Sequence, residues 1–157
     1  MCALKCVVYA SNTTYTFTPL MLKELAEGIT WQNQLKQITG FLVFQSGQFF
    51  QYIEGDNITI DKCMDSIRHD ERHHIFRHFS DGNLKKRRFA EWIMSLSYDI
   101  QDSTSIFQPL FINHLLMLNQ RYSDISEWRY CIWKEMDKLS QLYQHTRLSN
   151  KNPMIKE

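Results

Sequence analysis

The sequence predicts an α+β fold of the ferredoxin-like βαββαββ type, in which two helices cover one face of a mixed sheet and further helices follow. Short runs rich in β-branched and aromatic residues alternate with amphipathic segments of helical spacing, in the order strand, helix, strand, strand, helix, strand, strand. Of the 157 residues, 43% are apolar and 13% are aromatic, which is enough to build a buried core. A run of strands and helices in this order is typical of one sheet with its helices on one side.

The first strand is predicted over residues 4–11 (LKCVVYAS), because this apolar run stops at a polar Asn-Thr-Thr loop. Thr18 followed by Pro19 is typical of a helix N-terminus. Apolar side chains then recur at helical spacing, at Leu22, Leu25, Ala26 and Ile29. Because Gly28 weakens a helix, we expect this one to end near Thr30 and to leave Asn33 just after it.

Two further strands are predicted over residues 38–44 (ITGFLVF) and 48–53 (QFFQYI), joined by a short turn at residues 45–47. A second helix is expected to begin at Thr59 and to end in the charged stretch 70–74 (DERHH). Its apolar face consists of Ile60, Cys63, Met64 and Ile67. Residues 75–79 and 89–98 are the last two predicted strands.

The remainder of the chain is predicted to be helical over residues 106–118 and 125–143, where apolar residues lie three and four apart. These helices either cap the free face of the sheet or join a second copy of the chain. The predicted organisation is a first domain at residues 1–100, a helical extension at 101–149 and a flexible polar tail at 150–157.

The charge and cysteine content exclude several classes of protein. A net charge of +1 gives no general attraction to nucleic acid or to a membrane surface. The basic run at residues 85–88 (KKRR) is expected to be a solvated hairpin loop and not a nucleic-acid site. Four scattered cysteines and the absence of a long apolar run favour a reduced, cytoplasmic protein with no membrane span.

The clustered histidines near the end of the second helix are the only pattern that resembles a metal site. His69, His73 and His74 lie where a helix C-terminus favours positive charge, so dipole compensation or phosphate contact explains them better than a metal ion. No metal is therefore expected.

Polar side chains within apolar strands mark the candidate site. Tyr9 lies in the first strand and Gln51 interrupts an aromatic run in the third, and both need hydrogen-bond partners once they are buried. Trp92 and Met94 share one face of the last strand, because strand side chains alternate. Asn33 adds a further amide near the first helix.

The runs VVYAS, ITGFLVF, FFQYIEGD, SIRHDERHH and AEWIM follow one another in the order and spacing of the BLUF family, whose members sense blue light with FAD. From residue 3 to about residue 100 the chain resembles this family, and its layout is similar to the short stand-alone PixD and BlsA type. The resemblance implies that FAD lies between the two helices and under the sheet.

The resemblance also assigns roles to individual residues. Leu25 and Ile67 are expected to sandwich the flavin ring, and Asn33 to bind the N3–O4 side of its pyrimidine edge. Gln51 is expected to bridge Tyr9 to flavin N5 and the C4 carbonyl. The excited flavin then takes an electron and a proton from Tyr9, and the Gln51 amide rotates or tautomerises into a second hydrogen-bond pattern.

Five other positions match the family pattern around this centre. Asp70, Arg72 and His73 correspond to residues near the polar edge of the ring and the ribityl phosphate. Trp92 and Met94 correspond to residues that exchange places near Gln51 when the signal leaves the site.

One departure from the family pattern concerns Ser66, where many members have an arginine that donates to the flavin C2 carbonyl. The adjacent position before Asn33, Gln32, also varies in the family. With serine at position 66, the chain lacks this charged donor to the C2 carbonyl.

The expected function is a non-enzymatic photoreceptor that binds a regulatory protein, such as a transcription regulator, in a light-dependent complex, alone or as a homo-oligomer. Two alternatives belong to other classes. One is a flavin-dependent oxidoreductase, against which no nicotinamide site or acid–base pair is visible. The other is a light-independent interaction module that contains a structural flavin.

Overall fold

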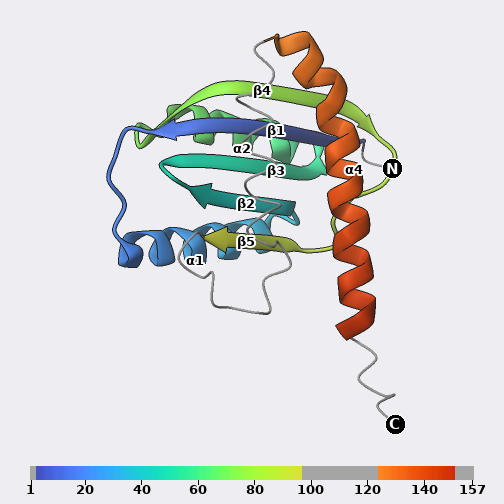
Figure 1. Cartoon of the computed structure of the whole chain (residues 1–157), viewed down its shortest axis with the longest axis horizontal. Coiled ribbons are helices and arrows are strands. Elements are labelled where there is room, and N and C mark those ends of the chain that lie inside the picture. The colour runs from blue at the N-terminus through green and yellow to red at the C-terminus, as the bar shows by residue number, and fades with distance from the viewer. Residues whose placement is uncertain (1–2, 97–123, 151–157) are drawn as a thin grey trace.

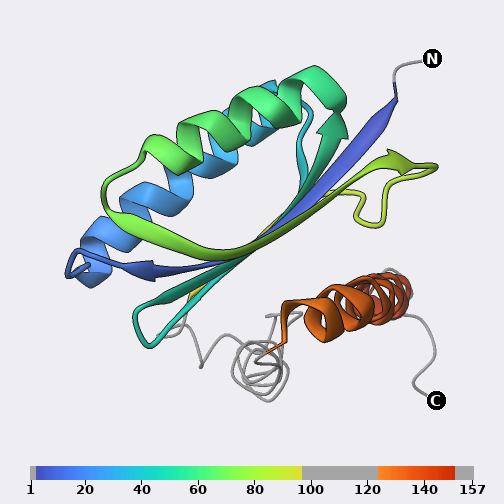
Figure 2. The ribbon, with the colours of Figure 1, turned by 90° about the horizontal axis from the view of Figure 1, so that it is seen from above.

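The computed structural model describes residues 3–96 and 124–150, and the side chains of residues 93–96 and 146–150 fall outside that description. Two helices lie on one face of a sheet and a third lies on the opposite face, as Figure 1 and Figure 2 show. The predicted helix at 106–118, the domain boundary near residue 100 and the polar tail after residue 150 lie outside the described residues.

The sheet has the strand order β4-β1-β3-β2-β5. Its strands are β1 (Leu4–Thr13), β2 (Thr39–Gln45), β3 (Gln48–Asp56), β4 (His73–Leu84) and β5 (Trp92–Leu96). The pairs β1–β3, β1–β4 and β2–β3 are antiparallel, whereas β5 runs parallel to β2. The predicted ferredoxin-like α+β fold with a mixed sheet is therefore confirmed.

Two glycines fix the β2–β3 hairpin. Gly47 follows Ser46 in the turn, and the φ angles of 73° and 52° are those of a two-residue turn with both central residues left-handed. At the other end of the hairpin, Gly40 has a φ of 135°, and a Cβ atom there would lie 2.0 Å from the Tyr52 carbonyl oxygen. Only glycine allows β2 to approach β3 this closely.

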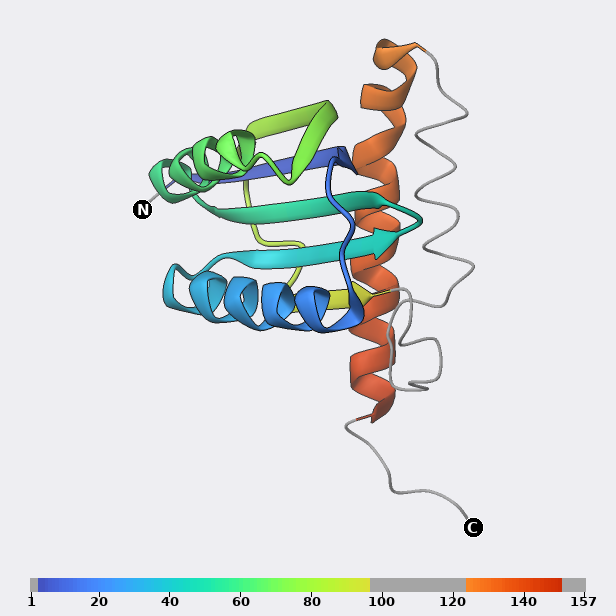
Figure 3. The same cartoon turned by 90° about the vertical axis from the view of Figure 1, so that its left-hand side faces the viewer.

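The helices α1 (Pro19–Leu35) and α2 (Asn57–His69) run alongside the strands, as Figure 3 shows. The Thr18 hydroxyl accepts a hydrogen bond from the Met21 amide, so the predicted N-terminus of α1 is correct. The predicted end near Thr30 is wrong. The helix continues through the exposed Gly28 to Leu35, because the cost of one glycine, about 1 kcal/mol, is small beside the packing of a whole helix face.

This correction moves Asn33 from a loop into α1, where it is buried. The start of α2 also differs from the prediction, because β3 continues to Asp56 and the Asp56 carboxylate accepts hydrogen bonds from the Ile58 and Thr59 amides. An aspartate in this position is a strong N-cap, so the helix begins at Asn57 and not at Thr59.

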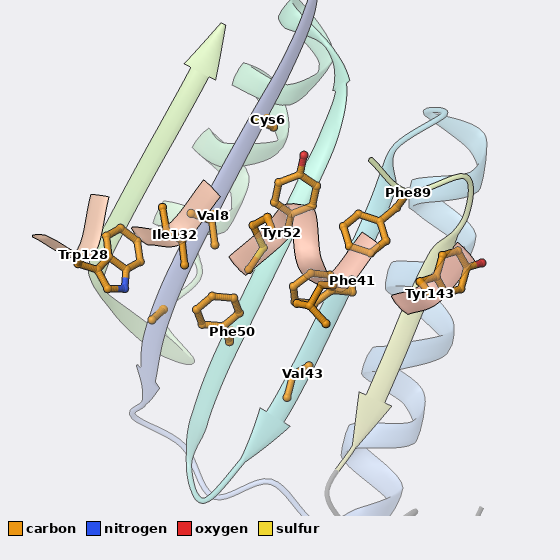
Figure 4. Close-up of a cluster of buried hydrophobic side chains, with 13 residues drawn as sticks. Cys6, Val8, Phe41, Val43, Phe50, Tyr52, Phe89, Trp128, Ile132 and Tyr143 are labelled. Atoms are coloured by element: carbon orange, nitrogen blue, oxygen red, sulfur yellow. The ribbon is translucent and has the colours of Figure 1, made fainter. Parts of the chain in front are cut away.

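The helix α4 (Ile125–Asn150) crosses the strands on the sheet face opposite to α1 and α2 (Figure 1). Its buried face consists of Trp128, Ile132, Met136, Leu139 and Tyr143. These side chains pack on aromatic and aliphatic residues of the sheet, including Val8, Phe41, Phe50 and Tyr52 (Figure 4). Of the two places predicted for the C-terminal helices, α4 occupies the free face of the sheet.

A buried polar network lies beside this apolar layer. The Glu54 side chain is fully buried, and its two carboxylate oxygens accept four hydrogen bonds: from the hydroxyls of Thr39 and Tyr52 and from the backbone amides of Arg88 and Phe89. Four donors are enough to satisfy a buried carboxylate. The network fixes the segment before β5 against β3.

The basic run at residues 85–88 is therefore more than the solvated loop that the sequence indicates. Lys85 and Lys86 are exposed, but the Arg87 guanidinium donates to the Thr39 hydroxyl and to the Glu54 carbonyl. The Arg88 guanidinium reaches Asp137 on α4 at 2.7 Å. Arginine in this loop joins the sheet to the helix behind it, which sequence periodicity cannot reveal.

Candidate functional site

A cavity of about 420 Å³ lies between α1, α2 and the sheet. This is within the range of small-molecule sites in proteins, roughly 300–1,000 Å³. All eight residues that the sequence analysis assigns to cofactor binding line this one cavity: Tyr9, Leu25, Asn33, Gln51, Ile67, Asp70, Arg72 and His73. The topology brings them together from β1, α1, β3, α2, the turn between α2 and β4, and the start of β4.

Tyr9 and Gln51 form the polar centre of the sheet side of the cavity. They are directly opposite each other in the antiparallel β1–β3 pair, and the Tyr9 hydroxyl donates a hydrogen bond to the Gln51 Oε1 atom. Each is only 4% exposed. Burial raises the pKa of the Tyr9 hydroxyl above its ordinary value, and the nearby Cys63 and Asp70 add to that rise. Tyr9 is therefore held protonated, as a hydrogen-bond donor.

Apolar side chains form the walls that face each other across the cavity. Leu25 on α1 and Ile67 on α2 both line it and pack against separate buried clusters. Phe49 and Leu42 close the sheet side beside Gln51. Two aliphatic walls on facing helices suit a flat apolar ring between them.

Asn33 supplies an unpaired donor. It is 5% exposed, it lines the cavity, and its Nδ2 atom is buried with no hydrogen-bond partner among the described residues. Leaving a buried amide donor without an acceptor costs about 1–3 kcal/mol of folding free energy. A ligand in the cavity that presents an acceptor to the Asn33 Nδ2 atom would remove this cost.

Asp70 and Arg72 form an ion pair at the end of α2. The Arg72 Nε and Nη2 atoms donate to the Asp70 carboxylate at 2.9 and 2.6 Å, and the Arg72 backbone amide donates to it as well. The hydrogen bond from Arg72 holds the pKa of the Asp70 carboxyl below its ordinary value, against a smaller effect of burial. The two side chains neutralise each other at the cavity wall.

His73 uses both ring nitrogens within the protein. Its Nδ1 atom lies 2.8 Å from the Ser11 hydroxyl, and its Nε2 atom lies 2.8 Å from the Ile67 carbonyl oxygen, to which it donates. The ring also packs on Tyr9 and Phe49. His73 therefore ties β1 to the end of α2 and forms part of the wall, without presenting an unused nitrogen to the cavity.

Trp92, one of the two predicted switching residues of β5, lies beside the cavity and not on its wall. Trp92 packs against the clusters that contain Tyr9 and Phe49, and its indole Nε1 atom is buried without a partner among the described residues. The backbone of Met94 is opposite Leu42, which is itself opposite Gln51. The Met94 side chain lies outside the described residues.

Sequence reasoning missed several residues of the wall, notably Phe17, Trp31, Lys36 and Cys63. Helical spacing placed Cys63 on the same apolar face as Ile67, one turn away, but did not mark it as a residue of the site. No pattern marks Lys36, because it follows α1 at a point where the helix was not expected to extend. Both Ser66 and Gln32, the two variable positions, also line the cavity.

Across residues 3–96 and 124–150, no group of three or more His, Cys, Asp or Glu side chains is arranged to hold a metal ion. Within the same residues, no helix combines the length and the apolar character that crossing a bilayer requires.

Comparison with known sequences identifies one family and several relatives. The model of the family described as "Sensors of blue-light using FAD" (BLUF) matches residues 4–95. Photoactivated adenylate cyclase subunit beta of Euglena gracilis is 31% identical over 129 residues, which cover 81% of this chain and 14% of the relative. Subunit alpha of the same organism is 32% identical over 109 residues, covering 69% and 10%. The matches thus span a small part of these relatives.

Solved structures show the same fold. A bacterial light-regulated adenylyl cyclase has a TM-score of 0.62 at 22% identity, over 85% of this chain and 39% of that one. The dark-state structure of the BLUF protein BlrB has a TM-score of 0.54 at 21% identity, over 66% and 80%.

Proposed function

The chain belongs to the BLUF family of blue-light sensors, and we propose that it is a blue-light receptor that binds FAD in the cavity between α1 and α2. In this proposal it signals to a regulatory protein partner, such as a transcription regulator, and has no enzymatic activity of its own. The observation that carries the proposal is the Tyr9–Gln51 hydrogen bond at the wall of a cavity of ligand size.

The residues present fit a flavin. The cavity offers facing aliphatic walls at Leu25 and Ile67, and the unpaired Asn33 Nδ2 atom offers a donor for a carbonyl oxygen. The Asn33 amide as a whole, with one acceptor and one donor end, is complementary to the alternating groups of a pyrimidine edge. We propose FAD over other flavins because the family is described by its use of FAD.

The bound flavin supplies absorption of blue light and, once excited, oxidising power. Tyr9 is the group that would give up an electron. Because burial disfavours its anion, the hydroxyl keeps its proton until then, and the oxidised side chain, which is strongly acidic, would pass that proton to its hydrogen-bond acceptor, Gln51 Oε1. Gln51 accepts from Tyr9 through Oε1, so its Nε2 end is left to donate elsewhere. Rotation or tautomerisation of this amide exchanges the two ends, and two such arrangements form a bistable switch.

The signal has two routes out of the site, both through the sheet. Gln51 and Tyr52 are consecutive in β3 and point to opposite faces, so β3 connects the cavity to the layer under α4. Leu42 joins Gln51 to Met94 across β2. In the proposal these two strands pass the change to β5 and α4, where a partner senses it.

Absorption spectra of the purified chain in darkness and after blue light test the proposal. We expect flavin bands that move to the red on illumination and relax in darkness. A colourless protein refutes flavin binding, whereas a yellow protein with no reversible shift refutes the switch. Steady-state oxidation of NAD(P)H, which we expect to be absent, separates a sensor from an oxidoreductase.

Single substitutions test the two switch residues. Gln51→Leu keeps the volume of the side chain but removes both amide ends, so we expect bound flavin without a red shift. Tyr9→Phe removes one hydroxyl and is expected to have the same effect. Tyr15→Phe is the matched control, because Tyr15 is half exposed and does not line the cavity. A normal red shift in Gln51→Leu contradicts the assignment.

A further inference from the structure

The cavity wall carries one unneutralised charge. Two cationic side chains, Lys36 and Arg72, and one anionic side chain, Asp70, line the cavity. Arg72 and Asp70 neutralise each other in the bidentate pair described above. The Lys36 ammonium has no ion pair or side-chain hydrogen bond among the described residues, so its positive charge is available to a ligand.

The position of Lys36 places this charge beside the unpaired amide. Lys36 is the C-cap of α1 and follows Asn33 by three residues, so the two side chains emerge from the same side of the helix end. Burial raises the pKa of the Cys63 thiol on α2, and the positive charge of Lys36 works against that rise. The positive charge of Lys36 therefore acts on the Cys63 thiol of the opposite helix.

Among the described residues, the α2 side chains that line the cavity include no cation. Cys63, Ser66 and Ile67 line the cavity there, and all three are uncharged. The Ser66 hydroxyl donates to the Lys62 carbonyl oxygen at 3.3 Å, within its own helix. Among the residues that the structure describes, Lys36 is the one cationic side chain near Asn33 that is free to donate to a ligand acceptor.

We propose that Lys36 binds the C2 carbonyl side of the flavin pyrimidine ring, next to Asn33 at the N3–O4 side. The inference rests on the proposed flavin site. A pyrimidine edge presents two carbonyl acceptors on either side of one N–H group. Asn33 supplies a donor and an acceptor for one carbonyl and the N–H, and Lys36 supplies a charged donor for the second carbonyl. Hydrogen bonds to a charged donor are about twice as strong as neutral ones.

Flavin affinity separates this role from a contact with the phosphates of the cofactor. Riboflavin has the pyrimidine ring but no phosphate, and FAD has both. We expect Lys36→Met to weaken the binding of riboflavin and of FAD to the flavin-free chain by the same factor, at least about tenfold. Lys36→Arg, which keeps the charge, retains most of the affinity. Lys23→Met, on α1 but outside the cavity wall, is the control.

A second measurement reports on the carbonyl itself. With riboflavin labelled with ¹³C at C2, the infrared stretch of that carbonyl is expected to move to higher frequency in Lys36→Met, because a donor is lost. Adding Ser66→Arg to Lys36→Met brings a cation from the facing helix and is expected to restore the frequency and the affinity.

The outcomes are distinct. If Lys36→Met weakens FAD but leaves riboflavin and the C2 stretch unchanged, Lys36 binds phosphate and the inference is overturned. Unchanged affinity for both flavins overturns it as well. If the unaltered chain binds neither flavin, the proposed flavin site itself has failed.

Discussion

Removing the Arg88 guanidinium is expected to loosen α4 from the sheet. Arg88 precedes β5, and its side chain is only 15% exposed. Its Nε atom donates to Asp137 of α4 at 2.7 Å, and its Nη1 atom donates to the Tyr52 hydroxyl at 3.0 Å. Its guanidinium also lies 5.1 Å from the centre of the Trp133 ring. Burial lowers the pKa of Arg88, but Asp137 and Tyr52 outweigh that effect and raise it overall.

The size of the effect follows from these three contacts. The Asp137 side chain is 55% exposed, so solvent screening limits that ion pair to about 0.5–1 kcal/mol. The Tyr52 hydrogen bond contributes about 1 kcal/mol, and the contact with Trp133 about 0.5–1 kcal/mol. Arg88→Met keeps the apolar stem and removes all three. We therefore expect a loss of about 2–3 kcal/mol in the free energy of unfolding.

Urea unfolding followed by circular dichroism measures this loss, and Asp137→Asn is the comparison. Asp137→Asn removes the ion pair alone and should cost less than about 1 kcal/mol. Hydrogen exchange of α4 amides should accelerate in Arg88→Met more than exchange in β1 and β3. An Arg88→Met variant as stable as the unaltered chain, or one no less stable than Asp137→Asn, refutes the argument that Arg88 joins the sheet to α4.

Three further predictions concern other parts of the fold. Gly40→Ala is expected to destabilise the chain by at least about 3 kcal/mol, since its Cβ atom overlaps the Tyr52 carbonyl, and a thermal melt within a few degrees of the unaltered chain contradicts this. The hydrogen bond from Arg72 lowers the pKa of the Asp70 carboxyl from its ordinary value of 3.8. The ion pair therefore stabilises the fold above pH 3.8, and this contribution is lost as the pH falls through the lower pKa of the folded state. Asp70→Asn should therefore lower the urea midpoint at pH 7 and flatten its decline below about pH 4, and an unchanged acid slope is the contrary result. His73→Ala should weaken flavin binding by loosening the end of α2, as flavin titration measures, and full affinity would show that its two hydrogen bonds do not hold the wall.

The fold was predictable because its signals are local. Alternating and β-branched runs mark the strands, and Thr18 with Pro19 marks the start of α1. The end of α1 was not predictable from Gly28, because the packing of its far end against the sheet outweighs one local propensity. Likewise, the roles of Arg87 and Arg88 depend on partners far away in the sequence.

The residues of the candidate site that match the family pattern could be predicted from the sequence. The other residues of the cavity wall could not. Tyr9 and Gln51 are polar residues in apolar runs, so their burial could be anticipated from the sequence. The burial of Asn33 could not, because it lies among other amides and α1 was not expected to reach it. That both His73 nitrogens are bound within the protein required the geometry of Ser11 and Ile67. An exposed lysine such as Lys36 carries no signal, because most lysines at helix ends face only water.

The most direct test of the account is the light-minus-dark infrared spectrum of the chain prepared with isotopically labelled glutamine. We expect bands that move with the label and that disappear in Gln51→Leu, because the Gln51 amide changes its hydrogen-bond partners on illumination. A difference spectrum in which no band responds to the label would contradict it, since light would then leave the Tyr9–Gln51 arrangement unchanged.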